Sequence, residues 1–268
     1  MLVCVLSSGS AGNSIYLESA GTRVLVDAGL SLRETARRCV RQGLRARDLD
    51  AVVLTHEHGD HACGTAVIAR KLDLPVHATR GTFRGLREAP PEELRRIVHA
   101  GEPFVVGALR ITPFALPHDA WEPVGFVFDD GSSRAAVVTD LGAVTAGAIA
   151  ALQDLDALVL EFNHDVPLLL DGPYPWSLKK RIRGGHGHLS NEQGAHILRR
   201  VLHPGLRHLV LAHLSEHNNT ERHARAQADQ VLERAGARTR VYLGSQERAL
   251  EPIEIRGAVR ARQLALFA

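Results

Sequence analysis

The sequence predicts an α/β (α+β) fold in which two mixed β-sheets pack face to face and helices flank them on the outside. Short β-rich segments separated by turn residues fill the first half of the chain, and helices alternate with strands in the last third. The sequence contains no repeat, low-complexity tract or evident linker. We therefore expect a single domain over residues 1–268, in which residues 255–268 form a basic tail that is either loose or docked.

Turn residues divide the first half into short strands, a helix that Gly43 ends, and a strand followed by a second helix. The expected strands cover residues 3–6, 15–17, 23–26, 51–55 and 75–77, and the expected helices cover residues 32–42 and 61–72. Residues 51–55 are apolar and β-branched, as in a strand that is buried on both faces.

The second half is predicted to begin with two hairpins and to continue with helices that alternate with strands. The hairpins pair residues 103–106 with 109–116 and 124–129 with 134–139. Helices are expected over residues 144–152, 191–202 and 220–236, strands over 157–161, 208–212 and 240–244, and a loop rich in Pro and Gly over 166–187. Ser190 and Gln193 have the spacing of a capping box at the start of the second of these helices.

The composition limits the kind of site that the protein can build. The chain has 15 His and only 3 Cys, too few for a disulfide framework, so we expect imidazole and carboxylate groups to hold any metal. A formal net charge of +2 excludes a polycation. The sequence lacks a secretory signal and an apolar run of the roughly 20 residues that span a bilayer. We therefore expect a cytoplasmic protein with neither a membrane nor an organic cofactor as a partner.

The segment from Thr55 to His61 (Thr-His-Glu-His-Gly-Asp-His) is the most informative stretch of the chain. In a tight loop after a buried strand, His56 and His58 can point to one position, and Asp60 and His61 can point to a second position beside it. His and carboxylate side chains at this spacing are typical of two adjacent divalent metal ions. The alternative is a His-rich surface loop that binds metal only adventitiously.

Polar residues also stand at the ends of other apolar strands of the prediction, and a two-metal site needs such further ligands. These residues are Asp27, His118, Asp140 and His213. A single Asp or His at the end of a strand is commonly a cap or a turn residue. The recurrence of such residues alongside the His cluster favours a shared two-metal site over unrelated caps.

These residues resemble, in their order along the chain, the ligand motifs of the metallo-β-lactamase superfamily. The resemblance covers nearly the whole chain and implies a four-layer αββα sandwich with the site at one edge. It implies one metal held by His56, His58 and His118. It implies a second metal held by Asp60, His61 and His213, with Asp140 as the bridge and Asp27 as a brace for the His loop. The implied cofactors are two divalent metal ions, with Mn²⁺ expected and Zn²⁺ or Fe²⁺ as alternatives.

Further motifs resemble the YycJ/WalJ (VicX) family, which is related to the tRNase Z branch of the superfamily. They are Ser8-Gly9-Ser10-x-Gly12-Asn13-Ser14, Asn163-His164-Asp165, Gly187-His188-Leu189-Ser190-Asn191 and His213-Leu214-Ser215-x-x-Asn218-Asn219-Thr220. The resemblance implies a metal-dependent 5′→3′ exonuclease that acts on single- or double-stranded DNA ends in DNA repair, with RNA as an alternative substrate. His186 and the basic run at residues 179–183 depart from the family pattern, and the roles of His186 and His217 stay open.

Three residues are candidates for catalysis. Asp60 can orient the nucleophile or accept its proton, and by resemblance Glu161 and His188 form a pair that donates a proton to the leaving 3′ oxygen. An ion pair with a purely structural role is the alternative for Glu161 and His188. Other residues are candidates for substrate contact, with turn, cap and solvated-loop roles as the alternatives. They are Ser10, Asn13, His164, Ser190, Asn191, Lys179, Lys180 and Arg181.

The same metal ligands permit other functions, because this scaffold hosts lactamases, thioesterases, oxidoreductases and nucleases. A small-molecule hydrolase of the thioester or lactone type would not need His188. A third hypothesis is a non-catalytic partner protein that keeps metal only for folding. The Glu161 and His188 motifs favour the nuclease over both.

Overall fold

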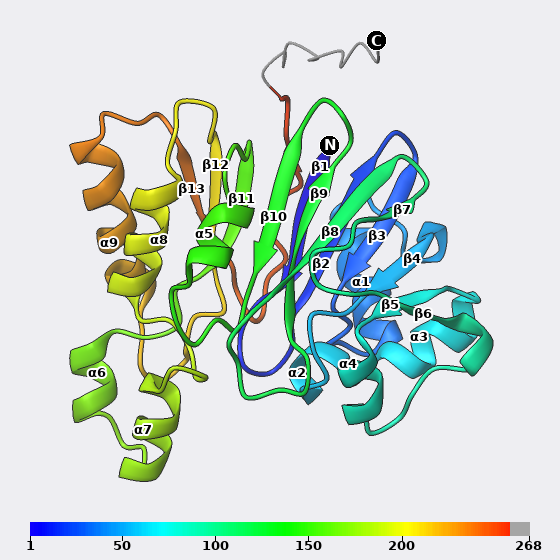
Figure 1. Ribbon diagram of the computed structural model, residues 1–268, viewed down its shortest axis with the longest axis horizontal. Coiled ribbons are helices and arrows are strands. Elements are labelled where there is room, and N and C mark those ends of the chain that lie inside the picture. The colour runs from blue at the N-terminus through cyan, green and yellow to red at the C-terminus, as the bar shows by residue number, and fades with distance from the viewer. Residues whose placement is uncertain (258–268) are drawn as a thin grey trace.

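The computed structural model describes residues 1–257, so most of the basic tail expected at 255–268 lies outside the described residues. Figure 1 shows two β-sheets packed face to face, with helices on the outer side of each sheet. No helix within residues 1–257 is long and apolar enough to cross a membrane.

Within residues 1–257, each sheet has seven strands and is mixed. In the order of hydrogen bonding, the first sheet consists of β14 (Ile253–Glu254), β1 (Leu2–Ser7), β2 (Ser14–Ser19), β3 (Thr22–Val26), β4 (Ala51–Val53), β5 (Val76–Ala78) and β6 (Arg95–Ile97). The second consists of β13 (Arg240–Leu243), β12 (His208–Ala212), β11 (Ala157–Glu161), β10 (Arg134–Val138), β9 (Val124–Asp129), β8 (Leu109–Ala115) and β7 (Phe104–Val106). Strands β3 to β6 and β10 to β13 are parallel, so their carboxyl ends lie at one edge of each sheet.

The helices occupy the outer layers and the connections. In the part of the chain that the structure describes they are α1 (Leu32–Arg41), α2 (Gly59–Ala62), α3 (Thr65–Leu72), α4 (Arg80–Gly85), α5 (Ala146–Ala151), α6 (Val166–Asp171), α7 (Trp176–Arg183), α8 (Asn191–Val201) and α9 (Glu221–Arg234). The short 3₁₀ helices are Ala46–Asp48 and Glu92–Leu94.

Three hydrophobic clusters hold the layers together. The middle cluster lies between the sheets, where Val5 and Leu17 of the first sheet pack in one core with Phe126 and Val137 of the second. The opposite faces of the strands pack against helices, with α8 and α9 over the second sheet and α1 and α3 over the first (Figure 1). Because side chains alternate across a strand, each sheet presents one apolar face to each neighbouring layer. The expected αββα sandwich is confirmed.

The prediction of a loop over residues 166–187 is wrong, because this segment contains α6 and α7. Asp165 caps α6 by accepting a hydrogen bond from the backbone N–H of Leu168, and a proline occupies the first turn, where no amide donor is needed. Pro175 precedes α7 and Gly184 follows it. The Pro and Gly residues that suggested a loop are therefore boundaries of two short helices.

The helix expected over residues 61–72 is divided into α2 and α3. The division falls at Gly64, whose N–H donates to Ala28 O at 2.8 Å and where a Cβ would lie 2.0 Å from Leu30 O. Close approach of the loop after β3 therefore requires glycine and interrupts the helix. The prediction also lacks β6, β14 and α4, whose few residues carry little periodicity.

Candidate metal centre

The candidate ligands lie at the edge of the sandwich where the parallel strands of both sheets end. Three of the strand-end residues, Asp27, Asp140 and His213, have positive φ angles of 60°, 59° and 54°. This left-handed conformation costs a non-glycine residue on the order of 1–3 kcal/mol and is concentrated at functional sites. It turns the chain sharply after each strand, so that side chains from separate strands converge.

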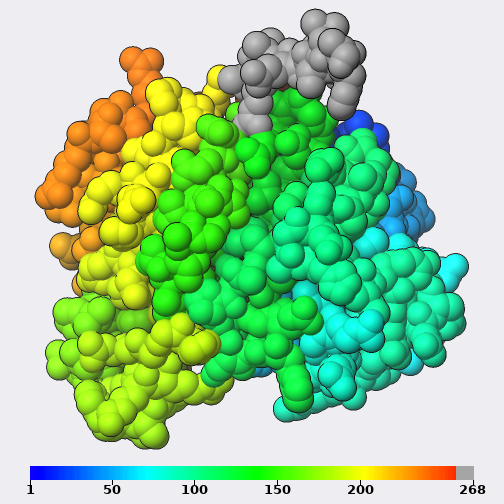
Figure 2. Space-filling view, viewed as in Figure 1, coloured from blue at the N-terminus to red at the C-terminus, as the bar shows by residue number. Residues whose placement is uncertain are grey.

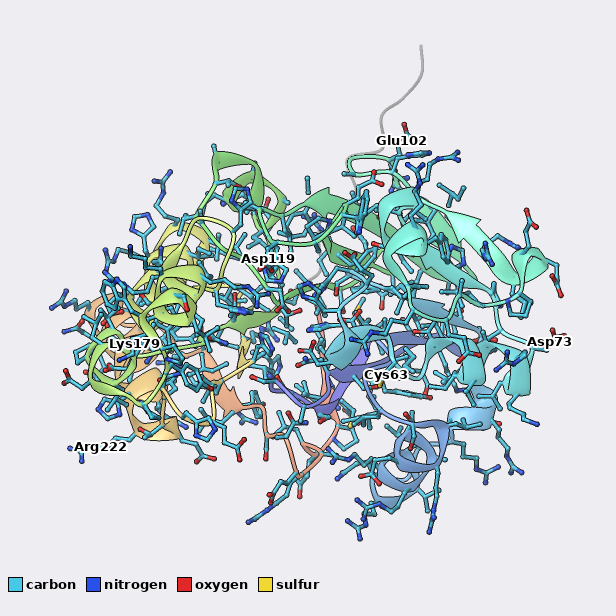
Figure 3. The ribbon with its side chains drawn as sticks, turned by 90° about the horizontal axis from the view of Figure 1, so that it is seen from below. Cys63, Asp73, Glu102, Asp119, Lys179 and Arg222 are labelled. Atoms are coloured by element: carbon cyan, nitrogen blue, oxygen red, sulfur yellow. The ribbon has the colours of Figure 1, made fainter. Side chains whose placement is uncertain are left out.

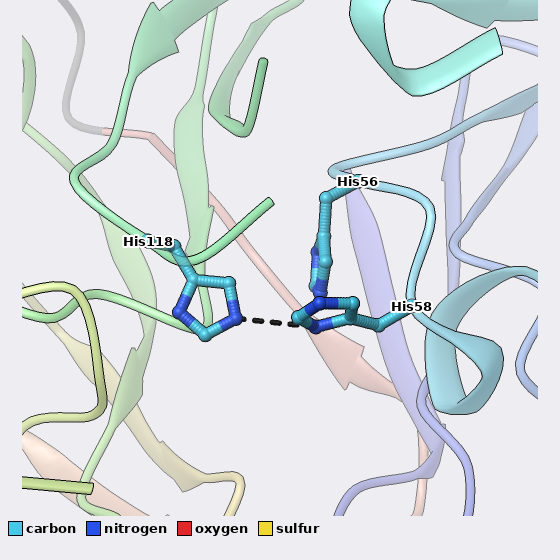
Figure 4. Close-up of side chains that lie close together, drawn as sticks. All are labelled: His56, His58 and His118. Atoms are coloured by element: carbon cyan, nitrogen blue, oxygen red, sulfur yellow. Dashed lines mark hydrogen bonds between the residues drawn. The ribbon is translucent and has the colours of Figure 1, made fainter. Parts of the chain in front are cut away.

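Three imidazoles form the first group of candidate ligands. A nitrogen atom of each of His56, His58 and His118 lies within 4.8 Å of the others. Figure 4 shows the three side chains close together, with His118 Nε2 at 3.3 Å from His58 Nδ1. Three nitrogen ligands at this spacing suit one divalent ion.

Asp60, His61 and His213 form a second group with the same spacing, and Asp140 lies between the two groups. Asp140 Oδ2 lies 3.0 Å from His61 Nε2. Asp140 Oδ1 lies 3.4 Å from His213 Nδ1 and 3.7 Å from His118 Nε2. A carboxylate in this position can contact ions in both groups.

Several buried polar atoms of the centre have no hydrogen-bond partner among residues 1–257. They include His56 Nε2 and His213 Nε2. An unpaired buried polar atom costs about 1–3 kcal/mol, so a concentration of them requires an explanation. Metal coordination would account for both. Nitrogen and carboxylate oxygen are ligands that Mn²⁺, Zn²⁺ and Fe²⁺ accept, so the residues fit the implied ions.

Hydrogen bonds on the outer side of the rings orient the candidate ligands. The Asp27 carboxylate accepts from Thr55 N at 2.8 Å and lies 2.7 Å from His61 Nδ1. His118 Nδ1 lies 2.9 Å from Gly187 O. Each contact engages Nδ1 and turns Nε2 of the ring toward the centre, and outer contacts of this kind commonly change metal affinity by about 10–100-fold.

The electrostatic environment favours a bound cation. Burial lowers the pKa of His56 well below its usual value, and the charge of His61 lowers it further, so this ring is neutral and offers a lone pair. Burial by itself would also lower the pKa of His213, but the Asp140 carboxylate and its neighbours raise this pKa to about 10. The carboxylates of the centre therefore stabilise positive charge strongly.

Glu161 is buried at the end of β11 and connects His188 with the metal centre. Its Oε1 lies 2.8 Å from His188 Nδ1 and 3.2 Å from His213 Nδ1. Burial raises the pKa of the Glu161 carboxyl, but the charge of His188 and the hydrogen bonds from His188 and His213 together lower it by more, and the pKa falls to about 2. Burial lowers the pKa of His188, whereas the carboxylates of Glu161 and Asp140 raise it by more. The protonated form that a general acid needs is therefore favoured.

Of the residues expected to contact substrate, Ser10 and Arg181 line a cavity together with His188. Lys180 is exposed on α7, with Nζ at 5.8 Å from the centre of the Trp176 ring. These three residues are accessible to a substrate.

Lys179 and Asn191 are not accessible, so their predicted contact with substrate is wrong. Lys179 is 8% exposed, and its Nζ donates to Leu170 O at 2.6 Å and Gly172 O at 2.7 Å. It thereby satisfies carbonyl groups at the end of α6. Asn191 is fully buried, and its side chain exchanges two hydrogen bonds with that of Asn219.

Ser190, His164 and Asn13 are buried and have structural contacts. Ser190 begins α8, where the predicted capping box is present. His164 pairs with Ser190 in an isolated β-bridge. Asn13 Nδ2 donates to Gly9 O at 3.0 Å and lies 2.9 Å from His61 Nε2, so it supports the His loop.

Asp119 is a candidate functional residue that the sequence-based prediction lacks. Its Oδ1 lies 3.3 Å from His118 Nε2, and its Oδ2 accepts a hydrogen bond from Arg181 Nε at 2.6 Å. Figure 3 shows Asp119 near the middle of the edge that carries the site. Its position directly after His118 is the only signal in the sequence.

Gly29→Ala is expected to destabilise the protein. Gly29 N donates to Asn13 O at 2.9 Å, and a Cβ on Gly29 would lie 1.8 Å from Asp60 O. The loops that carry Asn13 and Asp60 must then separate, and overpacking of this kind costs about 1–3 kcal/mol or more. Thermal unfolding measures the loss. The control is Gly147→Ala in α5, where a Cβ meets nothing within 4 Å. Equal unfolding temperatures for the two variants would contradict the expectation.

Comparison with known proteins shows the family to which the chain belongs. A family model described as "Beta-lactamase superfamily domain" matches residues 22–214. The chain is 37% identical over 235 residues to "Exodeoxyribonuclease YycJ" of Bacillus anthracis, covering 87% of this chain and 89% of that protein. It is 36% identical over 220 residues to "Exodeoxyribonuclease WalJ" of Streptococcus pneumoniae serotype 2, covering 80% of this chain and 82% of that protein.

A solved structure confirms the fold. The metallo-β-lactamase fold protein YhfI of Bacillus subtilis superposes with a TM-score of 0.70 at 18% sequence identity, covering 93% of this chain and 98% of that chain. Both levels of resemblance expected from the motifs are confirmed. The chain therefore belongs to the β-lactamase superfamily and, within it, to the family of YycJ and WalJ.

Proposed function

We propose that this protein is a two-metal phosphodiesterase that removes nucleotides from the 5′ ends of single- or double-stranded DNA. The relatives named exodeoxyribonuclease support DNA as the substrate. The observation that carries the proposal is the position of His188. Its Nδ1 lies 2.8 Å from Glu161 Oε1 and 3.5 Å from Asp140 Oδ1, so a proton donor stands beside the candidate metal centre.

A proton donor in this position favours a phosphodiester over a thioester. Cleavage of DNA releases a sugar oxygen, which is strongly basic unless it receives a proton as the bond breaks. A thioester releases a thiolate, whose conjugate acid has a pKa near 8.5, so its departure needs no acid. The Glu161 and His188 pair would have no task in the second reaction.

The metal ligands follow the grouping of the side chains. His56, His58 and His118 would hold one ion, and Asp60, His61 and His213 the other, with Asp140 shared between them. Bound divalent ions supply Lewis-acid chemistry, since they lower the pKa of water and neutralise negative charge on a phosphoryl group. We expect Mn²⁺, with Zn²⁺ and Fe²⁺ as alternatives.

Asp60 and His188 act at opposite ends of the bond change. Asp60 accepts a proton from the attacking water and passes it to solvent. The water oxygen forms a new bond to phosphorus, and the bond from phosphorus to the 3′ oxygen breaks. His188, held by Glu161, donates its proton to that oxygen. The released nucleotide carries a 3′ hydroxyl group, and the remaining DNA carries a 5′ phosphate.

DNA contact by α7 is expected to change the salt dependence of binding. Lys180 and Arg183 are exposed on this helix, whereas Arg181 is paired with Asp119. Replacing both by glutamine (K180Q/R183Q) should reduce the slope of log K against log salt by about 2. Fluorescence anisotropy with a 5′-phosphorylated duplex measures the slope.

The matched control for that experiment is R234Q/R238Q, which removes two exposed charges near the end of α9. Its slope should equal that of the wild type. An unchanged slope in K180Q/R183Q would remove α7 from the proposed DNA-binding surface.

We place the proposed activity in the cytoplasm and in DNA repair, with RNA as the alternative substrate. Cys4, Cys39 and Cys63 are free. Burial raises the pKa of the Cys4 thiol to about 12, so this group is not a reactive thiolate. Free thiols support a reducing compartment.

The test uses purified protein, Mn²⁺ and duplex DNA labelled at either end. A 5′ label should be released at once as a mononucleotide, whereas a 3′ label should remain on fragments that shorten progressively. Retention of both labels on full-length DNA would contradict the proposal. Early release of the 3′ label would mean that the enzyme degrades DNA from the 3′ end. Thioester hydrolysis that survives His188→Ala would favour the small-molecule alternative.

A further inference from the structure

A cavity of about 170 Å³ lies beside His188, on the side of α7. Its walls include Ser10, Tyr174, Leu178, Ile182 and Ser215. Figure 2 shows the lower edge of the molecule hollowed between the lime α6–α7 segment and the green and cyan segments. We propose that this cavity binds the nucleoside that leaves when the phosphodiester is cut. This inference rests on the proposed function and names the position of the leaving group.

The charges of the cavity are balanced, which favours a nucleoside over a phosphate group. Arg181 is the arginine of the wall, and its Nε already donates to Asp119 Oδ2 at 2.6 Å. A phosphate would have to displace this carboxylate or lie against it. A neutral sugar and base meet no such repulsion.

Polar groups of the wall can recognise a sugar or a base. Ser215 Oγ accepts hydrogen bonds from Asn218 N and Asn218 Nδ2, both at 3.2 Å, so the hydroxyl hydrogen can be donated to a ligand. Ser10 is exposed at the wall and adds a second hydroxyl. A few placed polar groups on a partly apolar surface are typical of small-molecule sites.

The apolar part of the wall comes from one side of α7 and the turn before it. Leu178 and Ile182 are four residues apart, so they lie on the same side of the helix. Tyr174 adds a ring that can pack against a base.

The position of the cavity indicates which part of the substrate is the leaving group. Because His188 protonates the leaving oxygen, the group bound in the cavity that His188 lines is the one that departs. This placement makes the bound nucleoside the leaving group of the reaction. It also supports removal from the 5′ end, because the departing nucleoside is attached through its 3′ oxygen.

Ser10→Phe tests the inference, because the new ring fills the cavity from an exposed position. Two substrates share a retained thymidine 5′-phosphate and differ in the leaving group: thymidylyl-(3′→5′)-thymidine releases thymidine, and thymidine 5′-(p-nitrophenyl phosphate) releases p-nitrophenol. We expect the ratio of kcat/KM for the first substrate to that for the second to fall by about tenfold or more. The inhibition constant of free thymidine should rise by a similar factor.

The control is Ser132→Phe, an exposed serine in the β9–β10 turn at the other end of the sheet, which should leave both quantities unchanged. Tyr174→Ala provides a second variant and should also raise the inhibition constant of thymidine. An unaltered ratio and an unaltered inhibition constant in Ser10→Phe would overturn the inference. Failure of the wild type to hydrolyse either substrate would contradict the proposed function itself.

Discussion

His188→Ala is expected to slow the hydrolysis of DNA by about 10²–10⁴-fold, the usual contribution of a positioned general acid. The same variant should lose much less activity on thymidine 5′-(p-nitrophenyl phosphate), because p-nitrophenolate leaves without a proton. The side chain is 23% exposed, so its removal leaves no large cavity in the core. Steady-state kinetics with both substrates measures the difference.

The control for this experiment is His99→Ala, which replaces an exposed histidine that is not part of the site motifs. It should leave both rates unchanged. Equal losses on the two substrates in His188→Ala would mean that His188 supports the metal centre and does not donate the proton. In that case Glu161→Gln should also lose equal activity on the two substrates, because Glu161 contacts both His188 and His213.

Asp140→Asn is expected to reduce bound metal from two ions to at most one for each chain and to slow DNA hydrolysis by on the order of 10³-fold or more, which is about 4 kcal/mol. The change removes the negative charge that lies between His61 and His118. Asparagine tolerates the left-handed backbone at this position, where φ is 59°, so the loss is chemical and not conformational. Elemental analysis of the purified variant gives the metal content.

Asp73→Asn is the matched control, because Asp73 has a φ of 53° and is exposed at the end of α3. Figure 3 shows it at the periphery, away from Asp119. It should retain the metal content and activity of the wild type. Full metal occupancy in Asp140→Asn would contradict the bridging role. Full occupancy together with full activity would remove Asp140 from the mechanism.

The positions of the candidate metal ligands could be predicted because the signal is local. Asp140 and His213 each follow an apolar strand, and parallel strands deliver their ends to one edge. His56 and His58 stand in one loop after β4. The hydrophobic pattern predicts where each strand lies, and the polar residue at the end of the strand indicates where the site lies. No long-range contact has to be known in advance.

The substrate side could not be predicted in the same way. Lys179 and Lys180 are neighbours in a basic run, but consecutive residues of a helix point in different directions, so one is buried and the other exposed. The exposure of each lysine follows only once α7 is known to be a helix. The contact of Arg181 with Asp119 joins residues 62 positions apart, and only the packing of α7 against the loop after β8 brings them together.

At one edge of the first sheet, a strand near the start of the chain pairs with a strand synthesised near its end. This pairing affects the risk of aggregation during translation. β14 pairs antiparallel with β1, and the amino group of Met1 donates to Ile255 O at 3.1 Å across 254 positions of sequence. Until β14 has been synthesised, β1 is an open edge that can pair with other chains. At roughly 5–20 residues per second, this exposure lasts roughly 12–50 s during translation. Slow translation or truncation before β14 should therefore promote aggregation of nascent chains.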